Sequence, residues 1–264
     1  MRRDPLTESE RLAYIAGKLR RNFESWGYRE IFLPCIEEYD ESLRRGTKFS
    51  YNNQFYLIKP DITSQIVFHM RKPRRMKIYY ISEVLDGGVK GTWQAGAELI
   101  GGEPPDMYVE IIKVAVSCLI AAGVEDFYVD VGSLEVWRKA TEDVREFRGR
   151  IFEALRRRNF QMIESLPLSQ EKKRELWRLF NFRGRRSGFE LLDEIVEKVE
   201  DERVFVDLGT MRPLPYYDNV VFDIYSPRLG YPIGGGGDYS AGGLRAVGFA
   251  LYLDGILRLR SGEV

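Results

Sequence analysis

Histidine and cysteine are scarce in this chain of 264 residues, which has one histidine, His69, and two cysteines. Cys35 and Cys118 are far apart in the sequence and form no C-x-x-C pair. Structural zinc sites usually take about four Cys or His ligands, so this scarcity argues against a zinc centre. We expect no metal and no cofactor. The two lone cysteines are interpreted as buried, reduced thiols, which are typical of a cytoplasmic protein.

An excess of charge of one sign and a long hydrophobic run are also absent. The 40 Lys and Arg residues balance 40 Asp and Glu residues, and this balance argues against strong non-specific binding of nucleic acids. The longest apolar run, Val114–Ala122, contains Ser117 and is too short to span a bilayer. The first residues, MRRDPLTESERL, lack the apolar stretch of a signal peptide. We therefore expect a soluble cytoplasmic protein without a membrane partner.

Hydrophobic residues make up 44% of the chain, enough for a core, and their spacing predicts both helices and strands. The predicted helices are 8–26, 61–70, 106–122 and 248–259. The predicted strands are 28–33, 54–58, 78–85, 92–100, 126–131, 204–208, 219–225 and 231–235. A turn at 87–91 is expected to join two of these strands into a hairpin.

Residues 133–200 differ from the rest, because they are rich in charge and have helical periodicity. Their basic clusters, 156–158 and 183–186, are interleaved with acidic residues, so we interpret them as solvated helix faces or an interface. The chain is thus predicted to have an α+β fold, in which a mostly antiparallel sheet carries flanking helices and is interrupted by a helical insert. We expect one domain over 1–264, with the insert at 133–200 inside it.

The second strand of the predicted hairpin places Gln94, Gly96 and Glu98 on one face, because alternate residues of a strand face the same side. A Gln and a Glu separated by a Gly that keeps the floor open suit a small zwitterion with a ring N–H. The alternative is a polar strand face that points into solvent. Further along the chain, Tyr216 and Tyr217 could stack on a ring and donate hydrogen bonds, or could be core aromatics.

Four consecutive glycines, Gly234–Gly237, precede Asp238 and Tyr239. Such a run costs backbone entropy and is typical of a loop that approaches a ligand or turns sharply. Its spacing matches neither the dinucleotide-binding motif nor the P-loop motif. Asp61 and Thr63 begin a predicted helix, where they are either a capping pair or a site for an α-ammonium group.

Taken in order, these segments resemble the class II synthetases of the histidyl type, from about Gly27 to the end of the chain. Gly27–Glu37 is similar to the first motif, which forms dimers in that family. The other matching segments are Pro60–Thr63, Gln94–Glu98, Tyr216–Tyr217, Gly235–Gly237 with Tyr239, and Val247–Leu253, which resembles the third motif. The resemblance implies the class II synthetase fold.

The resemblance also implies a site for free histidine. Glu98 would pair with the imidazole N–H, Asp61 would pair with the α-ammonium group, and Tyr239 would pack against the ring. The complete set of expected histidine-binding residues is Asp61, Thr63, Gln94, Glu98, Arg212, Tyr216, Tyr217 and Tyr239.

Departures from the synthetase pattern affect the binding of ATP. The second motif should read Phe-Arg-x-Glu, but here it is Leu85–Gly88, with Asp86 at the arginine position. The third motif should end in Glu-Arg, but here it ends in Asp254–Gly255, and Asp238 stands where the family has an arginine after its glycines. Arginine suits phosphate and aspartate repels it, so the departures imply no catalytic residues and no aminoacylation of tRNA. We also expect no anticodon-binding domain.

The same pattern resembles the regulatory subunit of short-form ATP phosphoribosyltransferase, a relative that keeps the synthetase core but does not aminoacylate. This resemblance implies a non-catalytic subunit that pairs with itself as a dimer, forms a hetero-octamer with the short catalytic subunit and activates it. It also implies feedback inhibition by histidine in the first step of histidine biosynthesis, with the glycosyltransferase chemistry in the partner. Lys59, Pro213 and Pro215 depart from the relative's Arg, Gly and Asp, which could alter histidine affinity.

Two alternatives stay open. One is a synthetase-like ligase that activates an amino acid for an acceptor other than tRNA, although it would need ATP contacts that the motifs lack. The other is a pseudo-synthetase scaffold that binds no ligand, in which case the glycine run is purely structural.

Overall fold

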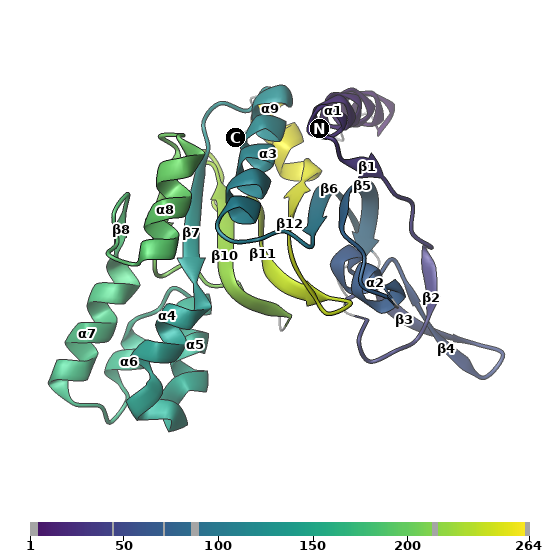
Figure 1. Ribbon diagram of the computed structural model, residues 1–264. Coiled ribbons are helices and arrows are strands. Elements are labelled where there is room, and N and C mark those ends of the chain that lie inside the picture. The colour runs from purple at the N-terminus through teal and green to yellow at the C-terminus, as the bar shows by residue number, and fades with distance from the viewer. Residues whose placement is uncertain (1–4, 44, 71, 86–89, 213–215, 262–264) are drawn as a thin grey trace.

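The computed structural model describes residues 5–43, 45–70, 72–85, 90–212 and 216–261 (Figure 1). Within these residues, nine strands form one sheet in the order β1-β5-β6-β12-β11-β10-β7-β9-β8. In this sheet β1 pairs with β5 and β7 pairs with β9 in parallel, whereas the other neighbours are antiparallel. The strands are β1 (Arg29–Glu30), β5 (Met76–Leu85), β6 (Gly91–Ile100), β12 (Leu244–Tyr252), β11 (Pro232–Ala241), β10 (Tyr217–Tyr225), β7 (Tyr128–Ser133), β9 (Val204–Asp207) and β8 (Arg183–Gly184). The predicted α+β fold with a mostly antiparallel sheet is confirmed.

Helices pack on both faces of the sheet, and the alternation of residues along each strand decides which layer a side chain meets. One face is covered by α1 (Pro5–Ser25), α3 (Asp106–Ala121), α8 (Glu190–Val199) and α9 (Leu253–Ser261) (Figure 1). Tyr79 of β5 belongs to the core on this side, together with Ile111 of α3. Tyr80, the next residue, belongs to a second core on the opposite side, where α2 (Ile62–His69) contributes Ile66.

A small second sheet lies beside α2 and has the strand order β2-β4-β3. Its strands are β2 (Ile36–Glu38), β4 (Gln54–Ile58) and β3 (Thr47–Tyr51). Gln65 and His69 of α2 hold this sheet in place, since both side chains hydrogen-bond to Glu37 Oε1, at 2.8 and 2.7 Å. Gln65 also donates to the carbonyl of Pro34 at 3.0 Å. One short helix is therefore tied to both sheets.

The segment between β7 and β8 is helical and has a core of its own. It consists of α4 (Leu134–Ala140), the 3-10 helix η1 (Glu142–Phe147), α5 (Arg148–Arg156), α6 (Gln161–Glu164) and α7 (Gln170–Asn181). Trp137, Ile151, Leu176 and Phe180 are among the buried side chains of this core. We call this part of the chain, residues 134–181, the insert; the predicted range 133–200 also includes β8 and α8, which belong to the large sheet and to the helical layer on it.

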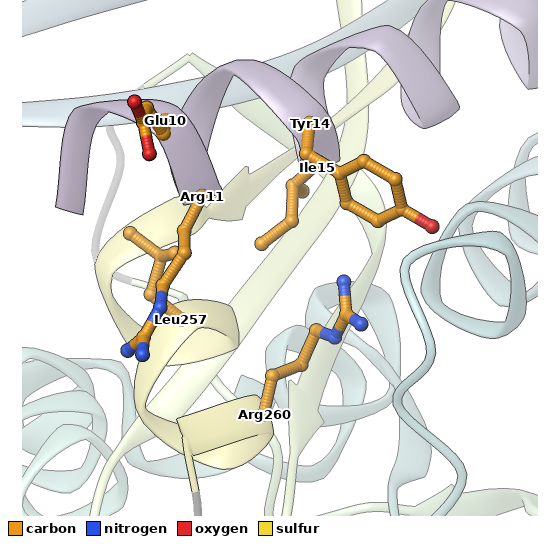
Figure 2. A pocket seen from close by; sticks show the side chains of 6 residues that line it. All are labelled: Glu10, Arg11, Tyr14, Ile15, Leu257 and Arg260. Atoms are coloured by element: carbon orange, nitrogen blue, oxygen red, sulfur yellow. The ribbon is translucent and has the colours of Figure 1, made fainter. Parts of the chain in front are cut away.

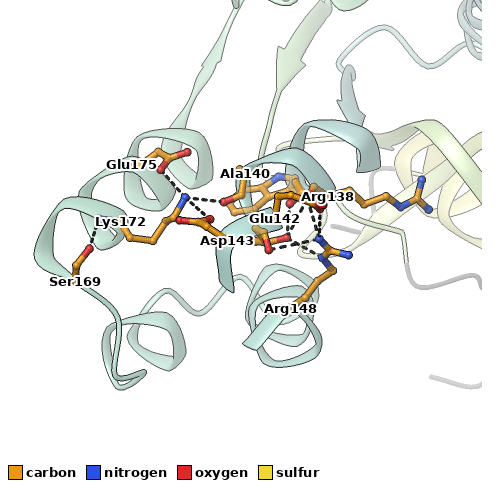
Figure 3. Close-up of polar contacts among 10 residues, drawn as sticks. Arg138, Ala140, Glu142, Asp143, Arg148, Ser169, Lys172 and Glu175 are labelled. Carbon is orange, nitrogen blue, oxygen red and sulfur yellow. Dashed lines mark hydrogen bonds and ion pairs between the residues drawn. The ribbon is translucent and has the colours of Figure 1, made fainter. Parts of the chain in front are cut away.

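Polar contacts hold the helices of the insert together (Figure 3). Lys172 lies at their meeting point, and its Nζ contacts Asp143 Oδ1 at 2.8 Å, Glu175 Oε2 at 2.8 Å and the carbonyl of Ala140 at 3.0 Å. Ser169 caps α7, because its Oγ accepts from the N–H of Lys172 at 3.1 Å. These contacts join α7 to the start of η1 and the end of α4.

Two of the predicted elements are wrong. Residues 248–252 were expected in a helix, but they end β12, and α9 begins at Leu253. A strand in the middle of a sheet that is covered on both faces is apolar at nearly every position, so it lacks the alternation that identifies strands. The predicted strand 231–235 stops within the run Gly234–Gly237, which was interpreted as typical of a loop, but the whole run forms the middle of β11.

Smaller differences concern the N-terminal third. The strands β2 and β3 were not predicted, and the predicted strand 28–33 is reduced to Arg29–Glu30. In the predicted turn, 87–89 lie outside the described residues, and Gly91 begins β6. Cys118 is buried, as expected, but Cys35 is exposed. No helix in the described ranges is long and apolar enough to cross a membrane.

Candidate functional site

A narrow pocket lies on the face of the sheet that carries α2, over the middle strands. Its lining comes from β5, β6, β10, β11, β12, the start of α2 and two connecting segments. The residues are Arg45, Asp61, Thr63, Tyr80, Gln94, Glu98, Arg212, Tyr216, Tyr217, Gly235, Gly237, Tyr239, Gly248, Phe249, Ala250 and Tyr252. The cavity has a volume of only about 30 Å³. The empty pocket therefore has room for about two water molecules.

Glu98 lies at the centre of the pocket and is 1% exposed. Its Oε1 accepts a hydrogen bond from Thr63 Oγ1 at 2.8 Å, and its Oε2 accepts one from the hydroxyl of Tyr239 at 2.9 Å. Burial raises the pKa of Glu98 to about 8, although these two hydrogen bonds lower it. A cation or an N–H donor placed against this carboxyl group would favour its ionised form.

Glycines make the floor of the pocket. They leave room for the side chains of neighbouring residues, which lie directly above them on the sheet. A Cβ on Gly248 would lie 1.6 Å from Glu98 Oε2, and a Cβ on Gly235 would lie 1.9 Å from Arg212 Nη1. A Cβ on Gly237 would lie 2.8 Å from the ring of Tyr217. Real Cβ atoms do not approach other atoms so closely, so the glycine run is a strand that makes room for charged and aromatic groups.

Asp61 serves both as the cap of α2 and as a wall of the pocket. Its Oδ1 accepts from the N–H of Ser64 at 2.9 Å, which satisfies one of the free donors at the helix start. The hydroxyl of Tyr216 lies 3.3 and 3.5 Å from its two carboxyl oxygens. Burial raises the pKa of Asp61, while the bond from Ser64 and the charge of Arg45 lower it. The two interpretations of Asp61 from the sequence, a helix cap and a site for an α-ammonium group, are therefore compatible.

Arg212 brings a buried guanidinium group to the pocket. Its Nη1 forms an ion pair with Asp223, and its Nη2 donates to the hydroxyl of Tyr252 at 3.0 Å. Burial alone would lower the pKa of Arg212, but the Asp223 carboxylate raises it above its ordinary value. Its Nε is buried and has no hydrogen-bond partner in the part of the chain that the structure describes.

The structure brings all eight predicted site residues into this one pocket. Gln94 is nearly buried on the same face as Glu98, and the rings of Tyr216 and Tyr217 meet edge to face at 5.0 Å. Tyr239 is fully buried and holds Glu98 through its hydroxyl. The binding of histidine by these residues stays a prediction.

Several lining residues were not singled out from the sequence. Tyr80 of β5 lies opposite Gly96 of β6, so the register of the predicted hairpin would have placed it on the pocket side. Gly248 was hidden by its assignment to a helix. Arg45 lies in the segment between β2 and β3, and no local pattern indicates it.

The positions that depart from the synthetase pattern fall in different places. Asp238 points to the face opposite the pocket, where it accepts from the hydroxyl of Tyr108 at 2.8 Å and from the N–H of Asn219 at 2.7 Å. Asp254 lies in the first turn of α9. Lys59 is not among the lining residues, and its Nζ lies 4.0 Å from Glu83. Asp86, Pro213 and Pro215 lie outside the described residues.

A second hollow lies between α1 and α9 (Figure 2). It is lined by Glu10, Arg11, Tyr14, Ile15, Leu257 and Arg260. Its charged side chains come from exposed helix faces, and the guanidinium of Arg260 lies 5.4 Å from the ring of Tyr14. It holds no counterpart of the buried Glu98, so the pocket over the sheet is the better candidate site. Among the described residues, no cluster of His, Cys, Asp and Glu could hold a metal ion.

Comparison with known proteins identifies the family. The histidyl-tRNA synthetase family model matches residues 4–195 and 171–256. The histidine–tRNA ligase of Methanocaldococcus jannaschii is 28% identical over 95% of this chain and 72% of its own length. An ATP phosphoribosyltransferase regulatory subunit of Geobacter metallireducens is 29% identical, over 88% of this chain and 64% of its own. The ATP phosphoribosyltransferase regulatory subunit of Caldanaerobacter subterraneus is 28% identical over 92% of this chain and 77% of its own length.

Solved structures agree in fold. An ATP phosphoribosyltransferase regulatory subunit/histidyl-tRNA synthetase from Bacillus halodurans has a TM-score of 0.87 at 22% identity, over 98% of this chain and 81% of its own. The ATP phosphoribosyl transferase HisG:HisZ complex of Thermotoga maritima contains a chain with a TM-score of 0.76 at 16% identity, over 90% of this chain and 96% of its own. The chain therefore belongs to the histidyl-tRNA synthetase family and has its class II fold.

Proposed function

We propose that this chain is a non-catalytic regulatory subunit of short-form ATP phosphoribosyltransferase that binds free histidine in the pocket over the sheet. The observation that carries the proposal is the Glu98 carboxyl group, buried on a glycine floor between the hydroxyls of Thr63 and Tyr239. A buried carboxyl group held in this way suits an N–H donor and disfavours a phosphate. The relatives named as regulatory subunits supply the biological context.

Histidine matches the polar groups of the pocket end to end. The imidazole N–H would bind Glu98, and the α-ammonium group would bind Asp61. The α-carboxylate would take the free Nε–H of Arg212, whose charge Asp223 fixes in place. Because the empty pocket is narrow, the Tyr216 hydroxyl has to leave Asp61 when the ammonium group arrives.

The partner in this proposal is the short catalytic subunit, which carries out the phosphoribosyl transfer in the cytoplasm. Two copies of this chain would pair through the first-motif segment, and the dimers would join the catalytic subunits in a hetero-octamer. Phe32 supports a contact there, because it follows β1 at the edge of the sheet and is 81% exposed. Histidine bound in the pocket would lower the activity of the complex, which is feedback inhibition of the first step of histidine biosynthesis.

The test is an assay of ATP phosphoribosyl transfer by a short catalytic subunit, with and without this chain and with and without histidine. We expect activity to rise on mixing and to fall with histidine. The double variant Gln94→Ala with Glu98→Ala should still activate but should no longer respond to histidine. Gln170→Ala with Glu171→Ala, at exposed positions of α7, is the matched control and should behave as wild type. No activation and no co-elution on mixing would refute the proposal. If histidine still inhibited the complex that contains the double variant, the assignment of the histidine site to this pocket would be wrong.

A ligase is the second candidate, since Arg212 keeps a buried guanidinium group in the pocket and a histidine–tRNA ligase is among the similar proteins. It would activate an amino acid for an acceptor other than tRNA. Histidine-dependent exchange of pyrophosphate into ATP would establish this activity. If histidine gave neither exchange nor thermal stabilisation, the chain would be a scaffold without a ligand. A ligand at a hundredfold excess over its Kd would add about 2.7 kcal/mol to the stability.

A further inference from the structure

A row of three mostly buried carboxylates, those of Asp223, Asp130 and Asp207, crosses the sheet from the pocket toward the insert. Asp223 of β10 lies opposite Gly235 of the pocket floor on one side and opposite Asp130 of β7 on the other. Residues directly opposite each other in a sheet point to the same face. The Asp223 and Asp130 carboxylates therefore lie on the pocket side of the sheet, next to each other.

Each carboxylate of the row has an arginine. Asp223 holds Arg212 of the pocket, and Asp130 accepts from Arg183 Nε at 2.9 Å. Asp207 of β9 is the next carboxylate, 6% exposed, and its Oδ2 lies 2.9 Å from Arg158 Nη2.

The carboxylates of the row are close enough to affect one another. Burial and the neighbouring charge of Asp207 raise the pKa of Asp130 to about 6, although Arg183 lowers it. Burial lowers the pKa of Arg158, but Asp207, Asp130 and Asp223 together raise it above its ordinary value. Arg158 is thus within the field of Asp223, the carboxylate that holds Arg212.

Arg158 reaches the row from the insert, between α5 and α6. The structure is shaped to admit it, because a Cβ on Gly209 would lie 2.4 Å from Arg158 Nη1. Arg158 itself has a positive φ of 48°, a conformation that non-glycine residues adopt infrequently. Thr210 Oγ1 lies 3.4 Å from its Nη2. The insert therefore places one specific positive charge on the sheet.

We propose that Arg158 is a positioning residue for the ligand site: by neutralising Asp207, it sets the charge of the row that holds Arg212, and so the affinity of the pocket for a ligand carboxylate. This inference rests on the proposed function. Removing the charge of Arg158, whose side chain is 48% exposed, leaves a net negative charge on carboxylates that are themselves mostly buried. The negative charge draws Arg212 toward the row and repels an incoming carboxylate. Binding of a partner to the insert would act on the same row, and the coupling is reciprocal.

The test compares histidine with histamine, which keeps the imidazole and the ammonium group but lacks the carboxylate. Dissociation constants are measured by calorimetry for wild type, Arg158→Gln and Arg157→Gln. Arg157 is the control, because it is the adjacent residue and pairs with Glu153 on the surface. We expect Arg158→Gln to weaken the binding of histidine about fivefold or more and to leave the binding of histamine nearly unchanged. Arg157→Gln should leave both ligands unchanged.

A second variant separates charge from a general loss of structure. Arg158→Gln combined with Asp207→Asn removes both charges of the pair, so histidine affinity should return toward the wild-type value. The inference would be overturned if Arg158→Gln weakened the binding of histidine and of histamine equally, or did not weaken the binding of histidine. It would also be overturned if the double variant failed to restore the affinity for histidine. If wild type bound neither ligand, the proposed function would fail as well. Binding by wild type with an unaltered Arg158→Gln variant would overturn this inference alone.

Discussion

At the scale of single residues, the geometry of the pocket depends on the contact of Glu98 with Gly248. A Cβ at position 248 would lie 1.6 Å from Glu98 Oε2 and 2.3 Å from its Cδ. The contact is with the carboxyl group itself, which Thr63 and Tyr239 hold in place. The side chain therefore cannot shift without losing hydrogen bonds in a buried site, where an unpaired polar group is costly.

The first prediction is that Gly248→Ala lowers the stability by about 1–3 kcal/mol, as overpacking in a core does, and abolishes stabilisation by histidine. Gly149→Ala is the control, because Gly149 lies on α5 with nothing within 4 Å of its Cβ position. It should gain up to about 1 kcal/mol from the higher helix propensity of alanine. Urea unfolding with and without histidine measures the stability of each variant and its stabilisation by histidine. A Gly248→Ala protein with unchanged histidine stabilisation would contradict the assigned geometry.

The second prediction concerns the proton on Glu98, whose pKa is raised from 4.5 to about 8. The folded state keeps this proton at pH values where the unfolded chain has lost it. The resulting stability is fully present below about pH 4.5 and is lost as the pH rises through about 8, by at most about 1.4 kcal/mol per pH unit. Glu98→Gln removes this dependence. Its unfolding free energy should fall less steeply than that of wild type between pH 5 and 8.

Buried carboxyl groups away from the pocket, such as Asp130, are present in both proteins, so their contributions cancel in the difference between the two curves. Parallel curves for wild type and Glu98→Gln would show that Glu98 is ionised throughout this range.

At the scale of elements, the insert contributes a core separate from that of the sheet. Leu176 is fully buried in it, next to Trp137 and Phe180. The third prediction is that Leu176→Ala costs about 2–5 kcal/mol, since truncation leaves a cavity. Hydrogen exchange should show faster opening of α4–α7 than of β5 and β6. Trp177→Ala, at the neighbouring exposed position, should change the stability by less than about 0.5 kcal/mol. Uniformly faster exchange over the sheet would contradict a separate core.

The sequence predicts elements well where periodicity is clear. The hairpin of β5 and β6, the helix α3 and the helices of the insert alternate or repeat as expected, and the structure confirms them. The helix assigned to 248–252 was wrong because β12 is covered on both faces and has no polar side. The short strands β2 and β3 belong to a small sheet whose order depends on contacts with α2, which no local pattern reports.

The same limit applies to the pocket. The spacing of Gln94, Gly96 and Glu98 predicts one shared face, and strand alternation is sufficient for that. That Asp61, Glu98 and Tyr239 meet could be expected only from the family resemblance, because they lie on three separate elements. The ion pair of Asp223 with Arg212 and the row beyond it follow from the register of β10 against β7 and β11, which the sequence alone does not give.

At the scale of the whole molecule, the fold is shared by ligases and regulatory subunits, so function has to be argued from the site. The proposed dimer is the part of the function that concerns the outer surface. Phe32 is 81% exposed beside the edge strand β1, and Ile36 is 48% exposed on β2. Such side chains next to an edge strand favour a contact with a second copy.

The fourth prediction is that Phe32→Glu converts a dimer into a monomer, because a carboxylate would be buried without a partner in the contact. Sedimentation velocity at several concentrations measures the change. Trp177→Glu places the same charge on an exposed aromatic position of the insert and should leave the dimer intact. A Phe32→Glu protein that still sediments as a dimer would exclude this surface from the contact.

The glycine floor also constrains how the pocket can evolve. A pocket lined by large side chains can be enlarged by a single substitution, but Gly235, Gly237 and Gly248 have no side-chain atoms left to remove. Every substitution there can only fill the site. New ligand preferences would therefore have to arise through the walls, at positions such as Asp61 and Tyr216. The glycine floor would therefore be retained in descendants that had lost the original ligand, and it would show where an ancestral protein bound it.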